Sequence, residues 1–363
     1  MKKRVVVGMS GGVDSSVAAL LLQRQGYEVI GATMQIWRSD DVCRIEKEGG
    51  CCGQSAVDDA RRVAAALGIP YYVMDFRDVF QEKVIDYFTR EYVRGRTPNP
   101  CIACNRYVKW QAMLQKSLEI GADYIATGHY ARVEKLPNGR YSIRNSVTAR
   151  KDQTYALYNL TQFQLAHTLM PIGDYEKDEV RRIAKEAGLP VFAKPDSQEI
   201  CFVPDDDYAG FLERETGGKV PGPGRFVWKD GTDLGPHKGI THYTIGQRKG
   251  LGVALGRPVF VIRIVPETDT VILGEAEDVF QQKLVCRDVN FMAAAPEDFP
   301  LGTSRTALGK VRYGHGGAPC RIERTKEDEL TAYFDAPVRA VTPGQAAVFY
   351  EEDHILCGGN ICA

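Results

Sequence analysis

In the first 200 residues, short apolar runs rich in β-branched residues alternate with segments whose apolar residues recur at helical spacing. The apolar runs predict strands at residues 5–7, 28–34, 71–74 and 124–128. The helical spacing predicts helices near residues 15–25, 55–67, 79–92 and 109–119, with an irregular basic loop before the last of them. Strands that alternate with helices of roughly 10–15 residues indicate a parallel sheet with crossover connections. We therefore expect an α/β fold with a doubly wound parallel sheet.

Two further elements are predicted before residue 200. Pro137, Asn138 and Gly139 supply turn residues for a β-hairpin over residues 131–143. Residues 178–188 have the pattern of a short helix that ends at Gly188.

From about residue 203 helical periodicity disappears, and proline and glycine interrupt the chain at Pro204, Pro221, Gly222, Pro223, Gly224, Gly231 and Gly235. Short strands are predicted at residues 306–313, 320–324, 330–334 and 346–350, a spacing that favours a compact β-barrel or sandwich. We expect three domains: a catalytic α/β domain over residues 1–203, a small mixed or β domain over 204–278, and a C-terminal β-barrel over 279–363.

Composition narrows the class of protein. The chain has 363 residues, 46 Lys and Arg against 47 Asp and Glu, and ten cysteines. This length excludes a small disulfide scaffold, and no apolar run approaches the ~20 residues of a membrane span. We expect a cytoplasmic protein without a membrane partner, whose cysteines are thiols, metal ligands or catalytic groups.

Positive charge gathers in two windows of this nearly neutral chain. Residues 90–110 carry five basic residues against Glu91, and residues 301–326 carry six against Glu323. Such windows either bind a polyanion or form a solvated face.

A phosphate-binding loop is predicted directly after the first strand. It comprises Gly8, Met9, Ser10, Gly11, Gly12, Val13, Asp14 and Ser15, and a helix follows at once. Backbone N–H groups, serine hydroxyls and the positive end of the helix dipole favour an anion there. Because no Gly-Lys-Ser or Gly-Lys-Thr occurs, the P-loop of kinases and GTPases is excluded. The loop instead resembles the PP-loop of ATP pyrophosphatases; the alternative is a glycine turn with a serine cap.

Three residues near this loop are candidates for nucleotide binding. Asp14 is interpreted as a Mg²⁺-site or loop-ordering residue, with a helix N-cap as the alternative. Met34 and Gly128 lie at the carboxyl ends of predicted strands, where the crevice of an open α/β sheet forms.

Cysteines mark a second candidate site. Residues 95–105 include Asn99, Pro100, Cys101 and Cys104 in a proline-rich segment with basic neighbours. We expect a rigid, electropositive loop in which those neighbours and the following helix lower the thiol pKa. A distant cysteine, Cys201, follows polar residues 196–199.

Five motifs together resemble the tRNA-specific 2-thiouridylase family over essentially the whole chain. They are the PP-loop, Thr-Pro-Asn-Pro-x-x-x-Cys-Asn, Ala-Thr-Gly-His-Tyr, Lys-Asp-Gln-Thr-Tyr and Ser-Gln-Glu-Ile-Cys-Phe. The resemblance implies an enzyme that uses ATP and Mg²⁺ to adenylate the wobble uridine of tRNA and then replaces O2 by sulfur. It also implies a persulfide donor or carrier protein as a partner.

The resemblance also implies roles for particular residues. Cys104 is the expected nucleophile, Cys201 the persulfide-bearing cysteine, and residues 8–15 with Met34 and Gly128 the ATP site. The target base is expected at Asn99, Pro100 and Cys101, and other tRNA contacts at His129, Lys151, Asp152, Gln153, Arg312, Tyr313 and Gln345.

Cys101 departs from the family pattern, which has an aspartate at this position. Besides a two-thiol persulfide relay, Cys101, Cys104 and Cys201 are therefore candidate ligands of an iron–sulfur cluster, and zinc is a further alternative. Two rival functions are a PP-loop amidotransferase or ligase and a zinc-containing RNA-binding module. The former leaves the cysteine segment unexplained, and the latter leaves the PP-loop unexplained.

The remaining cysteines have simpler interpretations. Cys43, Cys51 and Cys52 flank a glycine-rich charged insertion at residues 40–53. The alternatives there are a mobile lid, a second metal or thiol site, or no special role, and the poor chelating spacing of adjacent Cys51 and Cys52 favours the last. Small buried apolar positions are expected for Cys286, Cys320, Cys357 and Cys362.

Overall fold

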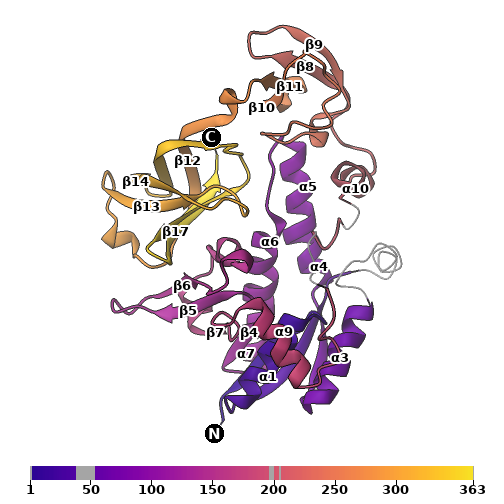
Figure 1. The fold of residues 1–363 in the computed structure, drawn as a ribbon, viewed down its shortest axis with the longest axis vertical. Coiled ribbons are helices and arrows are strands. Elements are labelled where there is room, and N and C mark those ends of the chain that lie inside the picture. The colour runs from indigo at the N-terminus through magenta and orange to yellow at the C-terminus, as the bar shows by residue number, and fades with distance from the viewer. Residues whose placement is uncertain (1, 38–53, 196–199, 204–205, 363) are drawn as a thin grey trace. The chain divides into compact units, whose positions relative to one another are not determined.

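A computed structural model describes residues 2–37, 54–195, 200–203 and 206–362 (Figure 1). The chain forms two compact units. The first comprises Met1–Val84, Pro100–Asp206 and Asp353–Ile355, and the second comprises Ile85–Asn99, Asp207–Glu352 and Leu356–Ala363. Among the helices of these described ranges, none combines the length and the apolar character that crossing a membrane would require.

A five-stranded parallel sheet forms the centre of the first unit. Its strand order is β3-β2-β1-β4-β7, and every neighbouring pair is parallel. The bounds are Arg4–Gly8 for β1, Glu28–Gln35 for β2, Tyr71–Asp75 for β3, Tyr124–Thr127 for β4 and Thr168–Leu169 for β7. The predicted doubly wound parallel sheet is confirmed.

Helices cover both faces of this sheet. On one face α1 (Val13–Arg24), α3 (Gln54–Leu67) and α9 (Lys177–Glu186) pack against Val5 and Val7 of β1. On the other face Met113 lies beside Gly8. Burial on both faces explains why the strands have continuous apolar sequences.

The segment that precedes Met113 differs from the prediction. One helical run begins at Pro100 and comprises α6 (Pro100–Ala103), a π-helical segment Cys104–Met113 and α7 (Leu114–Glu119). The irregular loop expected before residue 109 is therefore wrong for residues 100–108. Proline is tolerated in the first helical position because its missing N–H has no intrahelical acceptor there. A second broken helix comprises α4 (Arg77–Phe80), the π-helical segment Gln81–Ile85 and α5 (Asp86–Val93).

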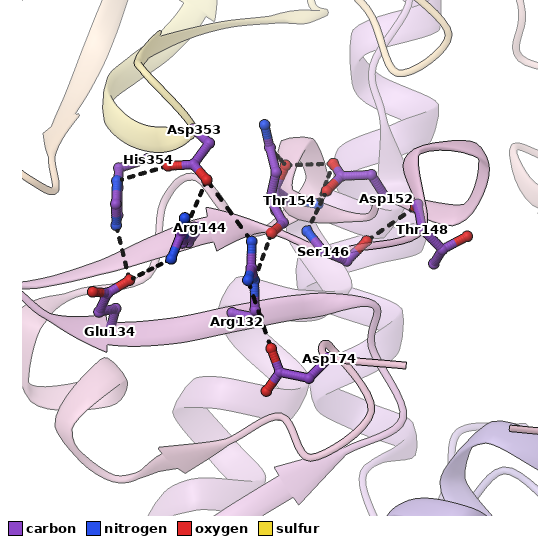
Figure 2. A network of polar contacts seen from close by, with 11 residues as sticks. Arg132, Glu134, Arg144, Ser146, Thr148, Asp152, Thr154, Asp174, Asp353 and His354 are labelled. Carbon is purple, nitrogen blue, oxygen red and sulfur yellow. Dashed lines mark hydrogen bonds and ion pairs between the residues drawn. The ribbon is translucent and has the colours of Figure 1, made fainter. Parts of the chain in front are cut away.

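The predicted hairpin is confirmed as β5 (Ala131–Lys135) and β6 (Tyr141–Asn145), with Gly139 at φ 83° in its turn. Residues 353–355 attach to it, because the Asn145 N–H donates to the Asp353 carbonyl at 2.8 Å. In Figure 2, Asp353 and His354 face the charged side chains of this hairpin. Two short helices complete the first unit, α8 (Gln162–Ala166) and the confirmed α9.

The second unit contains a small four-stranded sheet of order β10-β11-β8-β9. Its bounds are Gly224–Trp228 for β8, Asp233–His237 for β9, Phe260–Val265 for β10 and Thr270–Gly274 for β11. Phe226, Val261 and Leu273 belong to its buried core. No helix was located after residue 203, although a mixed domain was one expectation; the structure has α10 (Tyr208–Glu215), where the Asp207 carboxylate accepts from the Gly210 N–H at 3.0 Å. Two turns are too short for a clear periodic pattern.

Six antiparallel strands form a C-terminal barrel, as predicted. They are β12 (Phe280–Phe291), β13 (Ser304–Lys310), β14 (Ala318–Lys326), β15 (Glu329–Arg339), β16 (Ala346–Glu351) and β17 (His354–Ile361). The barrel closes because β12 pairs with both β15 and β17. Strands β12 and β17 lack clean alternation and were not predicted. The domain boundaries at residues 203 and 278 stay a prediction.

Candidate functional site

The loop after β1 has the geometry of an ordered anion cradle. Gly12 is the N-cap of α1, and the helix begins at Val13. The Ser10 N–H donates to Ser15 Oγ at 3.2 Å, and Ser16 Oγ donates to the Gly12 carbonyl at 2.7 Å. The loop is therefore held by its own serines at the N-terminus of a twelve-residue helix, where backbone N–H groups favour an anion.

Asp14 lies in the first turn of α1, so its interpretation as an N-cap is wrong. Lys177 Nζ donates to its two carboxylate oxygens at 2.7 and 2.8 Å, and the Tyr130 hydroxyl donates to Oδ1 at 2.8 Å. Both oxygens thus have a cationic partner. These contacts favour the loop-ordering role of Asp14 over direct Mg²⁺ binding.

A second lysine holds the loop from another side. Lys194 Nζ donates to the Gly11 carbonyl at 3.2 Å and to Asp59 Oδ2 at 2.6 Å. Burial raises the pKa of Asp59, but the opposite effect of Lys194 and Arg62 is larger. The pKa of Asp59 therefore lies below its usual value. No local pattern in the sequence marks Lys177 and Lys194, because they contact residues 163 and 183 positions away.

Gly128 and Met34 lie at strand ends, as predicted. A Cβ atom on Gly128 would lie 2.5 Å from Ser15 N. The backbone after β4 therefore packs directly against the first turn of α1, with no room for a side chain at residue 128. Met34 is half-buried near the end of β2, and its neighbour Thr33 donates to the Met9 carbonyl at 2.7 Å. The loop and the ends of β2 and β4 therefore converge.

The two cysteines of the predicted loop lie on the helix that begins at Pro100. Cys101 is exposed, whereas Cys104 is half-buried at the start of the π-helical segment. Burial raises the pKa of the Cys104 thiol; Lys109 opposes this effect and Cys101 adds to it. The expected lowering of the thiol pKa is wrong for Cys104, because desolvation outweighs the nearby positive charge.

A polar chain surrounds Lys109, which the sequence singled out only as one of several charges. Lys109 Nζ donates to Asn105 Oδ1 at 2.9 Å and lies 3.4 Å from His129 Nε2. Burial and the adjacent Lys109 hold the pKa of His129 well below its usual value. The ring is therefore neutral, with Nε2 accepting from Lys109 and Nδ1 donating to Thr127 Oγ1 at 2.7 Å.

The π-helical geometry explains why Lys109 interacts with both Cys104 and Asn105. In an α-helix, residue i+5 points about 140° away from residue i. The i to i+5 bonding of a π-helix brings these positions close to one face. Such segments often accompany functional sites.

Asp152 and Gln153 of the Lys-Asp-Gln motif accept hydrogen bonds from backbone N–H groups. Gln153 Oε1 accepts from the Tyr130 N–H at 2.9 Å, and Tyr130 in turn contacts Asp14. The Asp152 carboxylate accepts from the N–H groups of Ser146 at 3.0 Å and Thr154 at 3.2 Å (Figure 2). Lys151 lies half-buried in a 3₁₀ turn.

Cys201 is half-buried, and the adjacent Phe202 packs against Phe80 with ring centroids 6.0 Å apart. Residues 196–199 of its motif, and Cys43, Cys51 and Cys52, lie outside the described residues. Across the described part of the chain, no three His, Cys, Asp or Glu side chains are arranged to hold a metal ion. The choice between a persulfide relay, a cluster and zinc at Cys101, Cys104 and Cys201 therefore stays a prediction.

The other cysteines lie in the barrel. Cys286, Cys320 and Cys357 are buried, as predicted, whereas Cys362 is half-buried. Burial raises the pKa of each of these four thiols.

The remaining predicted tRNA contacts lie in the second unit. Gln345 Nε2 donates to the Thr97 carbonyl at 2.7 Å, which holds Gln345 beside the segment that leads to Asn99. Arg312 Nη1 donates to the Arg339 carbonyl at 2.7 Å, and Tyr313 is 51% exposed.

Both basic windows are partly neutralised within this unit. Arg94 and Arg96 each lie 3.5 Å from the Glu91 carboxylate. In the other window Arg321 pairs with Glu323 and Lys326 with Glu329. Glu91 and Glu323 were already counted in these windows, so among these pairs only Glu329 adds negative charge beyond the sequence count.

Comparison with known families matches three models along the chain. Residues 3–205 match the tRNA methyl transferase HUP domain, residues 209–275 the tRNA methyl transferase PRC-barrel domain, and residues 281–361 the aminomethyltransferase beta-barrel domain.

Similar sequences and folds are also known. The chain is 60% identical over 359 residues to the tRNA-specific 2-thiouridylase MnmA of Lachnoclostridium phytofermentans, covering 99% of both chains. It is 55% identical to that of Clostridioides difficile, covering 99% of this chain and 98% of the other. A solved structure of the U34-tRNA thiolase NcsA from Methanococcus maripaludis with its 4Fe-4S cluster matches 60% of this chain and 68% of its own. Its sequence identity is 18% and its TM-score 0.35.

Proposed function

Because the chain belongs to the tRNA-specific 2-thiouridylase family, we propose that it is a tRNA-uridine 2-sulfurtransferase. It uses ATP to replace O2 of the wobble uridine of tRNA by sulfur. The observation that carries this proposal is the role of two consecutive residues. Gly128 packs against the backbone of the PP-loop helix, and His129 contacts Lys109 on the cysteine helix. One strand end thus links a phosphate cradle to a thiol.

The first step activates the uridine. The backbone of residues 8–15 holds the ATP phosphates, and the nucleoside lies near Met34 and Gly128. Uridine O2 attacks the α-phosphorus, the bond to the bridging oxygen breaks, and pyrophosphate leaves. Donors that are already fixed in position stabilise the developing charge without reorganisation. Mg²⁺ assists ATP chemistry in general, but both oxygens of Asp14 contact Lys177, so no step is assigned to the metal.

The second step transfers sulfur. A persulfide donor loads Cys201, the terminal sulfur attacks C2 of the uridine, and AMP leaves with the former O2. The Cys104 thiolate then attacks Sγ of Cys201, which releases thiouridine and leaves a Cys104–Cys201 disulfide. Lys109 favours the reactive thiolate against the effect of burial.

Recognition requires an unstacked base and a held backbone. We assign the target base to Asn99, Pro100 and Cys101, and further tRNA contacts to His129, Lys151, Asp152, Gln153, Arg312, Tyr313 and Gln345. Single-stranded loops allow a base to be splayed into a site. A tRNA substrate also agrees with the expected cytoplasmic location.

Pyrophosphate release from ATP with unmodified tRNA tests the activation step. Asp14→Ala removes the partner of Lys177 and Tyr130, so we expect a loss of roughly 10²-fold in pyrophosphate release from a misplaced loop. Asp58→Ala, which removes an exposed carboxylate of α3, is the matched control and should retain wild-type release.

Two further variants separate activation from sulfur transfer. Cys104→Ser and Cys201→Ser should still release pyrophosphate but form no thiouridine, measured by nucleoside mass spectrometry. Wild-type release that does not depend on tRNA would contradict the proposal and favour a ligase acting on a small substrate.

A further inference from the structure

We propose that the tRNA-binding surface extends from the barrel onto the small four-stranded sheet, through a turn at residues 244–249 that holds backbone phosphates of the tRNA. Four basic residues form this surface, which we call the basic strip: Arg248, Lys249, Arg312 and Arg339. The inference rests on the proposed function, because it takes tRNA as the partner. It goes further by assigning a binding role to the small sheet, in which neither the motifs nor the family resemblance placed a functional residue.

Hydrogen bonds between the barrel and the turn make the strip continuous. Arg312 Nη1 donates to the Arg339 carbonyl at 2.7 Å, and Arg339 Nη2 donates to the Gly246 carbonyl at 3.2 Å. A Cβ atom on Gly246 would lie 2.8 Å from Cβ of Ala340, so the turn packs directly on the end of β15. The guanidinium of Arg339 also lies 5.5 Å from the ring centroid of Phe260, within the range of a cation–π contact. The barrel and the small sheet therefore carry adjacent positive charges.

The turn is held by hydrogen bonds of its own. Gln247 Oε1 accepts from the Thr244 N–H at 3.0 Å, and Gln247 Nε2 donates to the Lys249 carbonyl at 3.0 Å. The Gln247 carbonyl accepts from the Val261 N–H of β10 at 2.9 Å. The side chains of Arg248 and Lys249 are exposed on this fixed backbone. A backbone that is already ordered loses little entropy on binding, so the two cations are pre-organised for a ligand.

The charge of the strip is not neutralised by carboxylates. Three other exposed basic residues of the small sheet have carboxylate partners, namely Arg225, Lys229 and Arg257. Within the described ranges of the chain, none of the four side chains of the basic strip forms an ion pair. Four uncompensated positive charges at one surface attract a polyanion, and phosphates that bind there release their counterions.

A hollow of about 400 Å³ beside the turn raises the alternative of a small anion. Its lining includes Arg248 and Arg257, and its size lies within the range of small-molecule sites. Arg257 is already paired with Glu275, and the strip continues to Arg312 and Arg339, which do not line the hollow. A free phosphate or nucleotide in the hollow would leave those two charges unused, whereas an RNA backbone engages all four. The arrangement therefore favours tRNA over a small anion.

The salt dependence of tRNA binding tests the proposal. The double variant Arg248→Gln, Lys249→Gln removes two exposed side chains, so the fold should be retained. Because two phosphate contacts are lost, we expect roughly tenfold weaker binding and a slope of log K against log salt that is smaller by about 1.5 units. Filter binding without ATP, between roughly 50 and 200 mM salt, measures both quantities.

The matched control is the double variant Arg225→Gln, Lys229→Gln. It removes the same charge from the same sheet, but at residues that carboxylates already neutralise, and it should keep the wild-type slope. A wild-type slope in the Arg248→Gln, Lys249→Gln protein, or an equal reduction in the control, would overturn the proposal.

Two further measurements identify the ligand. Phosphate contacts carry no sequence information, so the Arg248→Gln, Lys249→Gln change should weaken binding equally for tRNAs with and without a wobble uridine. Weakening confined to the former would overturn the proposal. Calorimetry with inorganic phosphate and with ATP tests the hollow: binding of either that the double variant loses, while its tRNA affinity is unchanged, would assign the site to a small anion instead.

The proposed function and this inference fail separately. Failure of the wild type to form thiouridine would count against the proposed function, whereas the salt slope is measured without ATP and still tests the strip. In thiouridine formation, the Arg248→Gln, Lys249→Gln protein should show a KM for tRNA about tenfold higher than wild type, in line with its weaker binding. An unchanged KM would contradict a role of the strip in holding the substrate.

Discussion

At the residue scale, the reactivity of Cys104 depends on two opposing effects. Burial raises its pKa, and the ammonium of Lys109 lowers it. Lys109 is held by Asn105 and by neutral His129, so its charge stays beside the thiol. Lys109 thus offsets part of the loss of thiolate that burial causes at Cys104.

Lys109→Met should slow alkylation of Cys104 at pH 8 by roughly threefold to tenfold, because each pKa unit changes the thiolate fraction about tenfold. The rate is measured with iodoacetamide in a Cys101→Ser background. The tryptic peptide of residues 97–106 then has Cys104 as its one thiol. Lys109→Arg retains the charge and should restore most of the rate. Equal rates in all three proteins would show that Lys109 does not influence the thiol.

Gly128→Ala tests the close approach of β4 to the PP-loop. A methyl group 2.5 Å from Ser15 N must displace the backbone of α1, and such overpacking costs about 1–3 kcal/mol. We expect a lower Tm and at least tenfold slower pyrophosphate release. Gly222→Ala adds the same methyl group where nothing lies within 4 Å and is the control. An unchanged Tm in Gly128→Ala would contradict the packing argument.

At the element scale, charges fix residues 353–355 on the β5–β6 hairpin (Figure 2). Arg144 Nε donates to Asp353 Oδ2 at 2.6 Å, and His354 Nε2 lies 3.1 Å from Glu134 Oε2. Burial raises the pKa of Asp353, but the bond to Arg144 outweighs it, and the net pKa lies below the usual value. A depressed carboxyl pKa stabilises the fold above its unfolded pKa of about 3.9 and loses this effect as pH falls.

Asp353→Asn should therefore lower the free energy of unfolding at pH 7 by up to about 1 kcal/mol, a value limited by solvent screening of the partly exposed pair. The difference from wild type should shrink as the pH falls below about 4, because the unfolded chain takes up the proton first, and it should vanish below the lower folded pKa, where Asp353 is protonated in both states. Thermal melts at pH 7 and pH 3 measure it. Glu186→Gln, in an exposed pair at 4.0 Å, is the control. A difference that grows on acidification would contradict the sign.

At the scale of the whole molecule, the chain has a net charge of -1, although its proposed substrate, tRNA, is a polyanion. In the second basic window, Arg321 pairs with Glu323 and Lys326 pairs with Glu329. Arg312 of the same window is the candidate tRNA contact that the family resemblance implies. Its Nη1 atom already donates to the Arg339 carbonyl, which fixes the guanidinium.

Arg312→Ala should weaken tRNA binding and reduce the slope of log K against log salt by about one unit, because one phosphate contact is lost. Filter binding between 50 and 200 mM salt, roughly the range in which such slopes are resolved, measures it. Arg225→Ala, which removes an exposed arginine paired with Asp233, is the control. Unchanged slopes in both variants would indicate that this window is a solvated face and does not contact tRNA.

Sequence alone determined the features that depend on local spacing. The alternation of apolar runs and helical segments was sufficient for the parallel sheet, the glycine and serine residues for the PP-loop, and the turn residues 137–139 for the hairpin. The same spacing failed where a pattern was short or irregular, as in α10, β12 and β17, and where proline began a helix at residue 100.

Only the tertiary structure decided which charges and thiols act together. Asp14 contacts Lys177 across 163 positions, Gly11 contacts Lys194 across 183, and Lys109 contacts His129 across 20. Burial then reversed the expected direction of the Cys104 pKa. Desolvation and long-range contacts depend on the packed arrangement of the chain, which residue order along one segment does not specify.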